Sequence, residues 1–335
     1  MLLGAVDTGK STFCAVLASA AARAGRRAAV VDADVGQSDV GPPACVGMGL
    51  LSRPIQRLAE VSASALYFVG STSPAGHLLP ALVGARLTVE AAQRAGADLV
   101  VVDTTGMVHG SAARMLKMSK IDALRPSHLV ALQRGGEVEH LLAPYAKARR
   151  PVIHRLPVSA RAEVRTREQR AAARKAAFQR YFESAVDTDL ALDQVAIQGS
   201  AWRSGQPLPG HMVRYLADQL GCTVAWAERS DEGIFAVVGD DCGRVNSDVL
   251  AAAFPDVSVR VARAEHFDGL LVGVRDGDDE TLGMGILRNI DFGSGHITLH
   301  SPVRQTEQIA ALRMGSLRLA VDCGEVTHNR PGATG

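Results

Sequence analysis

The feature that most constrains this chain is a glycine-rich segment close to its start. Residues 4–12 read G-A-V-D-T-G-K-S-T, which matches the complete phosphate-loop pattern G-x-x-x-x-G-K-[ST]. Such a loop turns its backbone N–H groups toward the β-phosphate of a nucleotide, its lysine reaches the β- and γ-oxygens, and its hydroxyl can ligate Mg²⁺. The apolar segment after it predicts a helix, whose N-terminus adds partial positive charge. The nucleotide-binding residues predicted here are Gly4, Asp7, Thr8, Gly9, Lys10, Ser11 and Thr12.

The segment before this loop is unusually short. A phosphate loop normally follows a buried strand of about five or six residues, and here only Met1 to Leu3 precede it. We therefore expect a truncated first strand, either because the strand is lost or because the translation start lies further upstream.

Strand and helix patterns alternate over the first part of the chain. Apolar runs at 27–32, 98–103 and 127–132 read as buried strands, and helical patterns separate them. This alternation is typical of a parallel sheet covered on both faces, which binds ligands at the carboxyl ends of its strands. The sequence thus predicts an α/β fold, a P-loop NTPase parallel sheet with helices on both faces.

The remaining chain divides by composition. We expect a P-loop core over 1–160 and a helix rich in Ala and Arg, which could act as a lid, over 161–186. Short strands with Gly and Asp turns over 187–325 predict a smaller β-rich C-terminal domain. The polar segment 326–335 is expected to be disordered.

Composition excludes several classes of protein. The five cysteines form no C-x-x-C pair or metal-spaced cluster, which argues against structural zinc and for a reduced compartment. No uncharged apolar run approaches about 20 residues, and no secretory signal pattern opens the chain. We therefore expect a cytoplasmic protein that does not contact membranes; its oligomeric state stays open.

Positive charge is concentrated in one stretch. Residues 145–180 hold eleven Lys and Arg but only two acids, Glu163 and Glu168, a net charge of +9 in a chain whose total is +1. Such a run is usually a solvated helix face. Beside a nucleotide-binding core, it also attracts phosphate-rich partners.

Acidic residues end two of the predicted strands. Asp32 and Asp34 follow the strand at 27–32, and a carboxylate there can bind Mg²⁺ or take a proton from an attacking hydroxyl. Two acids at i and i+2 point the same way only while the strand continues, so we assign Asp34 the active role and Asp32 a structural one. The alternative is a plain polar turn.

Two further turns resemble parts of a site. Asp103 stands where a Walker-B acid belongs, and Thr104, Thr105 and Gly106 after it offer hydroxyls and an N–H to a γ-phosphate. The turn that contains Ser71 and Thr72 is suited to lining a substrate groove, although by itself it is better explained as a plain loop.

The arginine-rich segment has helical spacing. Arg167, Arg170 and Arg174 recur at i, i+3 and i+7 and would share one face. A cationic helix over the γ-phosphate would neutralise charge that develops during phosphoryl transfer. The alternative is a solvated helix in which Glu163 and Arg167 form an ordinary i, i+4 pair.

Taken in order, these segments resemble the polynucleotide 5′-hydroxyl kinase family, which includes a eukaryotic pre-mRNA cleavage-complex subunit, ribosomal-RNA-processing kinases and shorter archaeal enzymes. The runs D-A-D-V-G-Q-S-D-V-G-P-P at 32–43 and V-D-T-T-G-M-V-H-G at 102–110 are similar to the archaeal form. Arg165 and Arg170, followed by Tyr181-Phe182, resemble the arginine lid of the family. One position departs, because Met107 stands where the family commonly has Trp.

The resemblance implies roles for individual residues. It implies transfer of the ATP γ-phosphoryl group, with Mg²⁺, to the 5′-OH end of RNA or DNA. Asp34 would be the general base. The catalytic residues so implied are Lys10, Asp34, Arg165 and Arg170. Together with the analysis of the individual turns, we expect the metal ligands to be Ser11, Asp34 and Asp103, and the substrate contacts to be Gln37, Ser71, Thr72 and Arg174.

Two other functions remain open at this point. A nucleotide switch, an ATPase or GTPase without a polynucleotide acceptor, could use the same loop and acids, although no N/T-K-x-D guanine motif is visible. The arginine-rich stretch favours an anionic acceptor over water. A catalytically inactive RNA-binding scaffold is disfavoured, because Lys10, Ser11 and Asp34 are all present.

Overall fold

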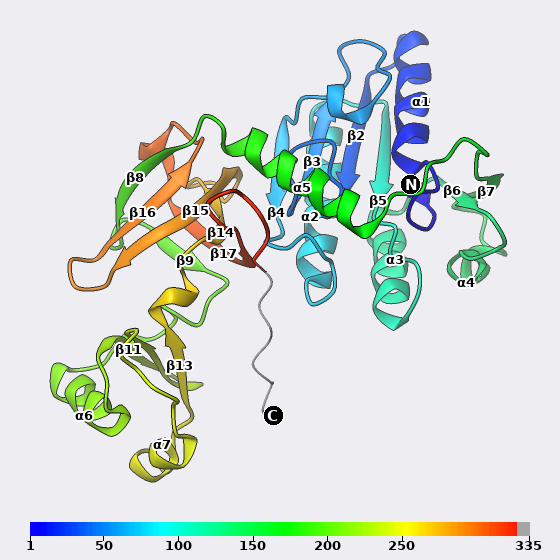
Figure 1. The fold of residues 1–335 in the computed structure, drawn as a ribbon. Helices are drawn as coiled ribbons and strands as arrows, with labels where there is room; N and C mark the ends of the chain where they lie inside the picture. The colour runs from blue at the N-terminus through cyan, green and yellow to red at the C-terminus, as the bar shows by residue number, and fades with distance from the viewer. Residues whose placement is uncertain (327–335) are drawn as a thin grey trace. The chain divides into compact units, whose positions relative to one another are not determined.

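The computed structural model describes residues 1–326, which divide along the chain into two compact units between Tyr181 and Phe182. Figure 1 shows the first unit in blue to green, built around parallel strands, and the second in green to red, built mainly from strands. The tail expected over 326–335 lies outside the described residues except for Val326, whose N–H donates to Arg318 O.

The first unit contains two sheets. One has the strand order β4-β3-β2-β5 and the other β1-β6-β7. The strands β1, β6 and β7 are parallel, as are β2 and β5, whereas β3 runs antiparallel to both its neighbours. The strands are β1 (Leu2–Leu3), β2 (Ala28–Ala33), β3 (Cys45–Leu50), β4 (Ala65–Phe68), β5 (Leu99–Thr104), β6 (His128–Gln133) and β7 (Val152–Pro157).

Helices cover both faces of these strands, as the sequence predicts. Alternate residues of a strand point to opposite faces. Accordingly Leu3 and Val31 pack in one core with α2 and α3, while Leu2 and Val30 pack in another with α1. The helical segments are α1 (Lys10–Arg23), η1 (Leu58–Glu60), α2 (Leu78–Arg94), α3 (Ser111–Leu124), α4 (Glu139–Leu142), η2 (Ala143–Tyr145) and α5 (Arg167–Phe182).

The strand β3 was not predicted from sequence. Its run C-V-G-M-G-L contains two glycines, which weaken a strand pattern. The structure explains both, since a Cβ on Gly47 would lie 1.8 Å from Val40 O and one on Gly49 would lie 2.4 Å from Ser62 O. The neighbouring backbone approaches too closely for any side chain there.

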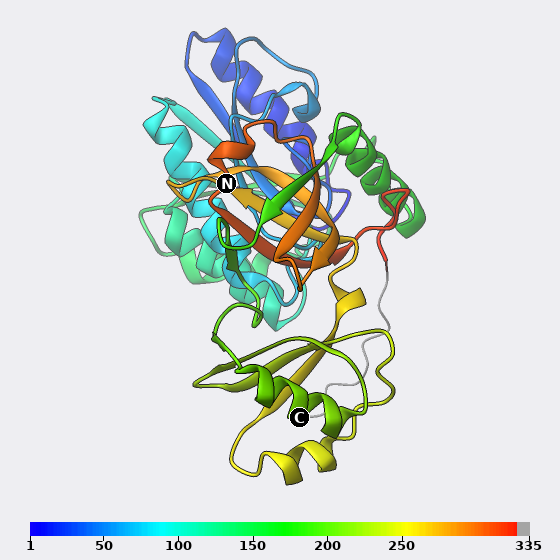
Figure 2. The ribbon, with the colours of Figure 1, turned by 90° about the vertical axis from the view of Figure 1, so that its left-hand side faces the viewer.

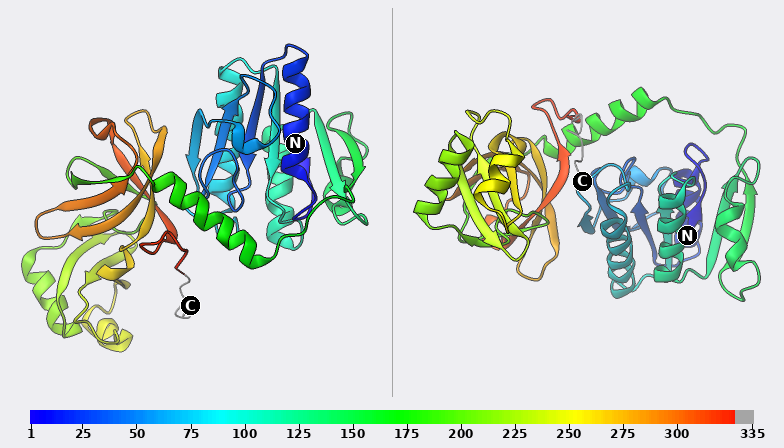
Figure 3. Two further views of the ribbon diagram at one scale, coloured as in Figure 1. Left: turned by 45° about the horizontal axis from the view of Figure 1, so that its top comes forward. Right: turned by 90° about the horizontal axis from the view of Figure 1, so that it is seen from below.

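The lid helix begins later than expected. We predicted a helix from residue 161, but α5 starts at Arg167, and residues 162–166 are irregular. Thr166 and Gln169 form a reciprocal capping box: Gln169 N donates to Thr166 Oγ1 (3.2 Å), and Thr166 N donates to Gln169 Oε1 (2.8 Å). Arg165 therefore lies on the extended segment that joins β7 to α5, which is visible in Figure 3.

The second unit is β-rich, with a six-stranded sheet of order β8-β16-β15-β14-β17-β9 and a four-stranded sheet of order β10-β11-β12-β13. Trp202 is fully buried and packs edge-on against Phe267 and Phe292. The strands are β8 (Val186–Ala191), β9 (Ala196–Gln198), β10 (Gln206–Pro207), β11 (Val224–Ser230), β12 (Gly233–Val238), β13 (Val259–Arg263), β14 (Leu270–Arg275), β15 (Thr281–Asp291), β16 (His296–Ser301) and β17 (Ala311–Arg318).

Two helices of this unit were not predicted. The helices α6 (Gly210–Leu220) and α7 (Ser247–Ala253) pack on one face of the four-stranded sheet, as Figure 2 shows, where Leu216 and Leu250 enter a shared core. The short 3₁₀ turns are η3 (Ala264–His266) and η4 (Thr306–Gln308). Over residues 1–326, no helix is both long and apolar enough to cross a membrane.

Candidate active site

The phosphate loop joins β1 to α1 and has the conformation that its glycines permit. Gly9 has φ 82°, and α1 begins at the next residue, so the helix N-terminus points at the loop. The side chain of Lys10 is largely buried, and its Nζ donates to Ala5 O (2.7 Å). Thr8 Oγ1 donates to the same carbonyl (2.9 Å), so Thr8 braces the loop from inside.

The hydroxyl after this lysine contacts the acid at the end of β5. Ser11 Oγ donates to Asp103 Oδ2 (2.5 Å), and Asp103 Oδ1 accepts from Thr104 N (2.7 Å). Burial raises the pKa of Asp103, an effect that the Lys10 charge and the Ser11 hydrogen bond partly offset. A hydroxyl and a carboxylate side by side are the oxygen ligands that Mg²⁺ favours.

The two acids after β2 have different environments. Asp32 is buried, and its carboxylate accepts hydrogen bonds from the backbone N–H groups of Asp34, Asp39 and Val40. Burial, with Asp103 and Asp34 close by, raises the pKa of Asp32 well above its usual range. Asp32 therefore shapes the loop that follows β2.

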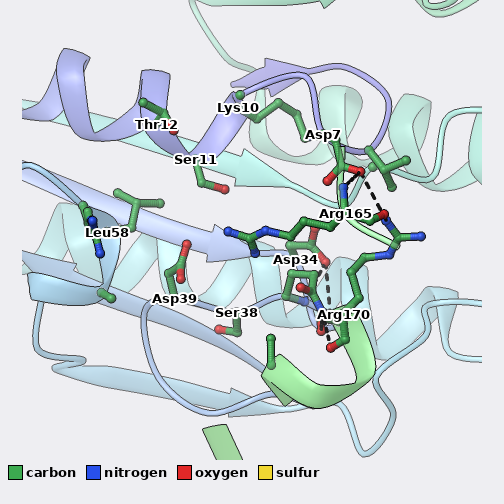
Figure 4. Close-up of a pocket in the computed structure, with 18 of the residues that line it drawn as sticks. Asp7, Lys10, Ser11, Thr12, Asp34, Ser38, Asp39, Leu58, Arg165 and Arg170 are labelled. Carbon is green, nitrogen blue, oxygen red and sulfur yellow. Dashed lines mark hydrogen bonds and ion pairs between the residues drawn. The ribbon is translucent and has the colours of Figure 1, made fainter. Parts of the chain in front are cut away.

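Asp34 instead faces the cavity beside the phosphate loop (Figure 4). Its Oδ1 accepts from Gly36 N (3.1 Å) and Gln37 N (3.3 Å), which fixes the carboxylate. No hydrogen bond to its Oδ2 is found in the part of the chain that the structure describes. This oxygen is available to a substrate.

The arginine segment contacts both the phosphate loop and the acid loop. Arg170 Nη1 and Arg165 N donate to the same oxygen, Asp7 Oδ2, at 3.2 and 3.1 Å (Figure 4). Gln37 Nε2 donates to Arg170 O (3.3 Å) from the opposite side. Arg165 also lies close enough to attract the carboxylate of Asp39. Two lid arginines are thus held next to the phosphate loop.

These elements enclose one cavity of about 650 Å³. It contains most of the predicted site: its lining includes Asp7, Gly9, Lys10, Ser11, Thr12, Asp34, Gln37, Gly106, Arg165, Arg170 and Arg174. The predicted residues outside the lining are Gly4, Thr8, Ser71, Thr72, Asp103, Thr104 and Thr105. Asp103 nevertheless lies directly behind Ser11, to which it is hydrogen-bonded.

The hydroxyl of Thr104 does not point where the sequence suggested. Thr104 Oγ1 donates to Leu2 O (2.7 Å) and so ties β5 to β1 inside the fold. Gly106 does reach the cavity, and a Cβ there would lie 2.7 Å from Val6 Cα in the phosphate loop. The turn after β5 therefore supports the loop, and the hydroxyl of Thr104 is not presented to a γ-phosphate.

Sequence reasoning missed several residues of the site. Arg57, Asp39, Arg161 and Arg180 also line the cavity, so it is lined by six arginines, including the three predicted ones. Their positions depend on how distant loops fold together, which no local pattern reveals. The lysines Lys117 and Lys120 of α3 were also missed, although they stand on an otherwise apolar helix face with Leu116 and Ile121.

The buried ammonium of Lys120 should affect the stability of the folded chain in a pH-dependent way. Burial lowers its pKa from 10.5 to about 8, although Asp34, Asp32 and Asp103 act in the opposite direction. Below pH 8 both folded and unfolded chains carry the proton, so folding bears the full cost of burying the charge, about 3 kcal/mol. Between pH 8 and 10.5 the unfolded chain binds more protons, so stability from this group rises with pH.

We therefore expect Lys120→Met to increase the free energy of unfolding at pH 7 by up to about 3 kcal/mol. That gain should shrink as the pH rises toward 10.5. Urea unfolding of the variant and the parent chain at pH 7 and pH 10 measures it. If the variant is less stable than the parent chain at pH 7, or if its gain in stability grows with pH, Lys120 does not carry a buried charge with a lowered pKa.

A phosphate loop on a parallel sheet, with a carboxylate from the neighbouring strand and arginines facing it, defines a nucleotide-binding protein of the P-loop class. Comparison with known proteins is more specific. The sequence profile described as "mRNA cleavage and polyadenylation factor CLP1 P-loop" matches residues 4–184. The chain belongs to this family.

Relatives and solved structures agree with that placement. The polyribonucleotide 5′-hydroxyl-kinase of Pyrococcus furiosus is 31% identical over 97% of this chain and 89% of its own length. The polyribonucleotide 5′-hydroxyl-kinase of Thermococcus kodakarensis is 30% identical over 97% of this chain and 89% of its own. A solved complex of Clp1p with Pcf11p has a similar fold, with a TM-score of 0.58 at 12% identity, covering 95% of this chain and 73% of that one.

Proposed function

We propose that this chain is an ATP-dependent polynucleotide 5′-hydroxyl kinase that transfers the γ-phosphoryl group to the 5′-OH end of RNA, with DNA ends as a second substrate. Two archaeal relatives that match nearly the whole chain are named as kinases of this kind. The observation that carries the proposal is the cavity in which Lys10 and Asp34 face the lid arginines.

The reaction follows from the positions of these groups. Asp34 accepts the proton of the 5′-hydroxyl, and the resulting oxygen nucleophile forms a bond to the γ-phosphorus. The bond between this phosphorus and the β–γ bridging oxygen breaks, and ADP leaves. Lys10, Arg165 and Arg170 supply positive charge around the phosphoryl oxygens as negative charge builds up on them.

The residues present also fit a magnesium ion. Ser11, Asp103 and Asp34 would hold it, because all three supply oxygen ligands: Ser11 Oγ is hydrogen-bonded to Asp103 Oδ2, and the charge of Asp34 acts on Asp103. Bound there, Mg²⁺ would neutralise charge on the β- and γ-phosphates.

The cavity favours a polynucleotide acceptor over water. A nucleotide triphosphate already has Lys10 and the N-terminus of α1 as partners. Six arginines around the same cavity exceed what the nucleotide alone requires, and a hydrolase needs only water as acceptor. The surplus charge is suited to the phosphates that follow a 5′ end.

The test uses γ-labelled ATP with Mg²⁺ and matched oligonucleotides that end in 5′-OH or 5′-phosphate, as RNA and as DNA. We expect label on the 5′-OH oligonucleotides alone, with RNA labelled at least as well as DNA. Phosphate release without labelled oligonucleotide would reject the kinase and favour the nucleotide switch.

A further inference from the structure

Two lysines of α3 lie completely inside the first unit. Lys117 and Lys120 each expose 0% of their surface, although lysine is almost never fully buried without a specific partner. They stand one turn apart on the face of the helix that packs under the carboxyl ends of the strands. Neither residue lines the cavity, so neither contacts substrate.

Lys117 binds the turn that follows β5. Its Nζ donates to Thr104 Oγ1 (2.6 Å) and also to Thr105 O. Thr104 Oγ1 in turn donates a hydrogen bond to Leu2 O, two residues before the phosphate loop. Gly106, the next residue of the turn, packs against the backbone of Val6 within that loop. The ammonium therefore fixes the turn on which the phosphate loop rests.

Lys120 lies inside the fold next to the acidic residues at the ends of β2 and β5. Its Nζ donates to Ala33 O (3.4 Å), the carbonyl directly before Asp34. The carboxylates of Asp34, Asp32 and Asp103 are the charges that stabilise its ammonium. Three acids gathered at the ends of two neighbouring strands repel one another. The buried ammonium of Lys120 opposes that repulsion from inside the fold, and it does not occupy the cavity.

We propose that Lys117 and Lys120 are positioning residues for phosphoryl transfer, with Lys117 holding the phosphate loop through the turn after β5 and Lys120 holding Asp34 at the end of β2. The inference rests on the proposed function and deepens it. A plain packing role is the alternative, and it predicts a different pattern of losses: both variants would lose stability, nucleotide affinity and turnover together.

The experiment compares Lys117→Met, Lys120→Met and, as a control on the exposed face of the same helix, Arg114→Met. Each is measured for ADP affinity, for the turnover rate of oligonucleotide labelling and for Tm. Lys120→Met is expected to lower kcat by at least about tenfold while ADP affinity stays within about threefold and Tm does not fall. Lys117→Met is expected to weaken ADP binding by about tenfold, and Arg114→Met to leave both unchanged.

A second variant separates charge from packing. Lys120→Ala leaves space where the ammonium stood, so added ethylammonium should restore part of the lost kcat, whereas sodium chloride at equal ionic strength should not. The same addition should not rescue Lys120→Met, because the methionine fills that space.

Two results would overturn the inference. One is kcat and ADP affinity near those of the parent chain in both lysine variants. The other is a parallel loss of Tm, ADP affinity and kcat in both, without rescue by the amine. If the parent chain itself labels no oligonucleotide, the proposed function fails instead, and the same variants are compared by phosphate release from ATP, which uses the same loop and acids.

Discussion

Asp34→Asn is expected to lower the rate of 5′-end labelling by about 10² to 10⁴-fold while nucleotide affinity is preserved. The amide has the size of the carboxylate and keeps an oxygen that can accept from Gly36 N and Gln37 N, so the loop should remain folded. It loses the ability to take the proton of the attacking hydroxyl. Single-turnover labelling at saturating ATP measures this loss directly.

The control for this substitution is Asp218→Asn, which makes the same chemical change on an exposed position of α6 in the second unit. It should label like the parent chain. Labelling by Asp34→Asn within about threefold of the parent would remove the general-base role. An equal loss of ADP affinity and rate would instead indicate that Asp34 acts in binding the nucleotide.

The phosphate loop and the acids beside it could be predicted from sequence because each is a local feature. Lys10 and Ser11 follow directly from a contiguous pattern, and parallel strands bring the acids at their carboxyl ends to one edge. The assignment of different roles to Asp32 and Asp34 used only the expectation that the strand ends between them. Local geometry was sufficient there.

Other features depended on contacts between distant segments. In β3, Gly47 and Gly49 allow other backbone segments to approach closely, which the composition of this run does not indicate. The direction of Thr104 is decided by Leu2 O, a partner 102 residues away in sequence. The start of α5, in contrast, could have been predicted from sequence, because the pattern T-R-E-Q at 166–169 is a recognisable capping box.

Lys117 and Lys120 show where sequence reasoning could have gone further. Helical spacing places both beside Leu116 and Ile121, so the sequence puts two cations into an apolar stripe. Such a conflict between residue type and position is expected at functional sites, which violate the local rules that the rest of a fold obeys. Helical spacing alone is enough to reveal this conflict, whereas the partners of the two lysines come from distant strands and follow only from the tertiary fold.

Arg170→Ala is expected to slow phosphoryl transfer by about 10³-fold or more in kcat. The guanidinium of Arg170 is already held at the phosphate loop by Asp7 Oδ2 at 3.2 Å, so little motion is needed to bring it onto a γ-phosphate. Its charge is most useful when negative charge accumulates on the transferring oxygens, so kcat should fall much more than ADP affinity.

Arg170→Lys tests whether charge alone is sufficient. Lysine keeps the positive charge but lacks the planar fork that binds two phosphate oxygens, so it should recover only part of the lost kcat. Arg114→Ala on the exposed face of α3 is the matched control and should not change labelling. If Arg170→Ala weakens ADP binding as much as it slows transfer, the arginine stabilises the bound nucleotide rather than the transition state. The residue that stabilises the transition state would then be another arginine of the cavity. If Arg170→Lys restores the full rate, the fork contributes nothing and charge is the whole of its role.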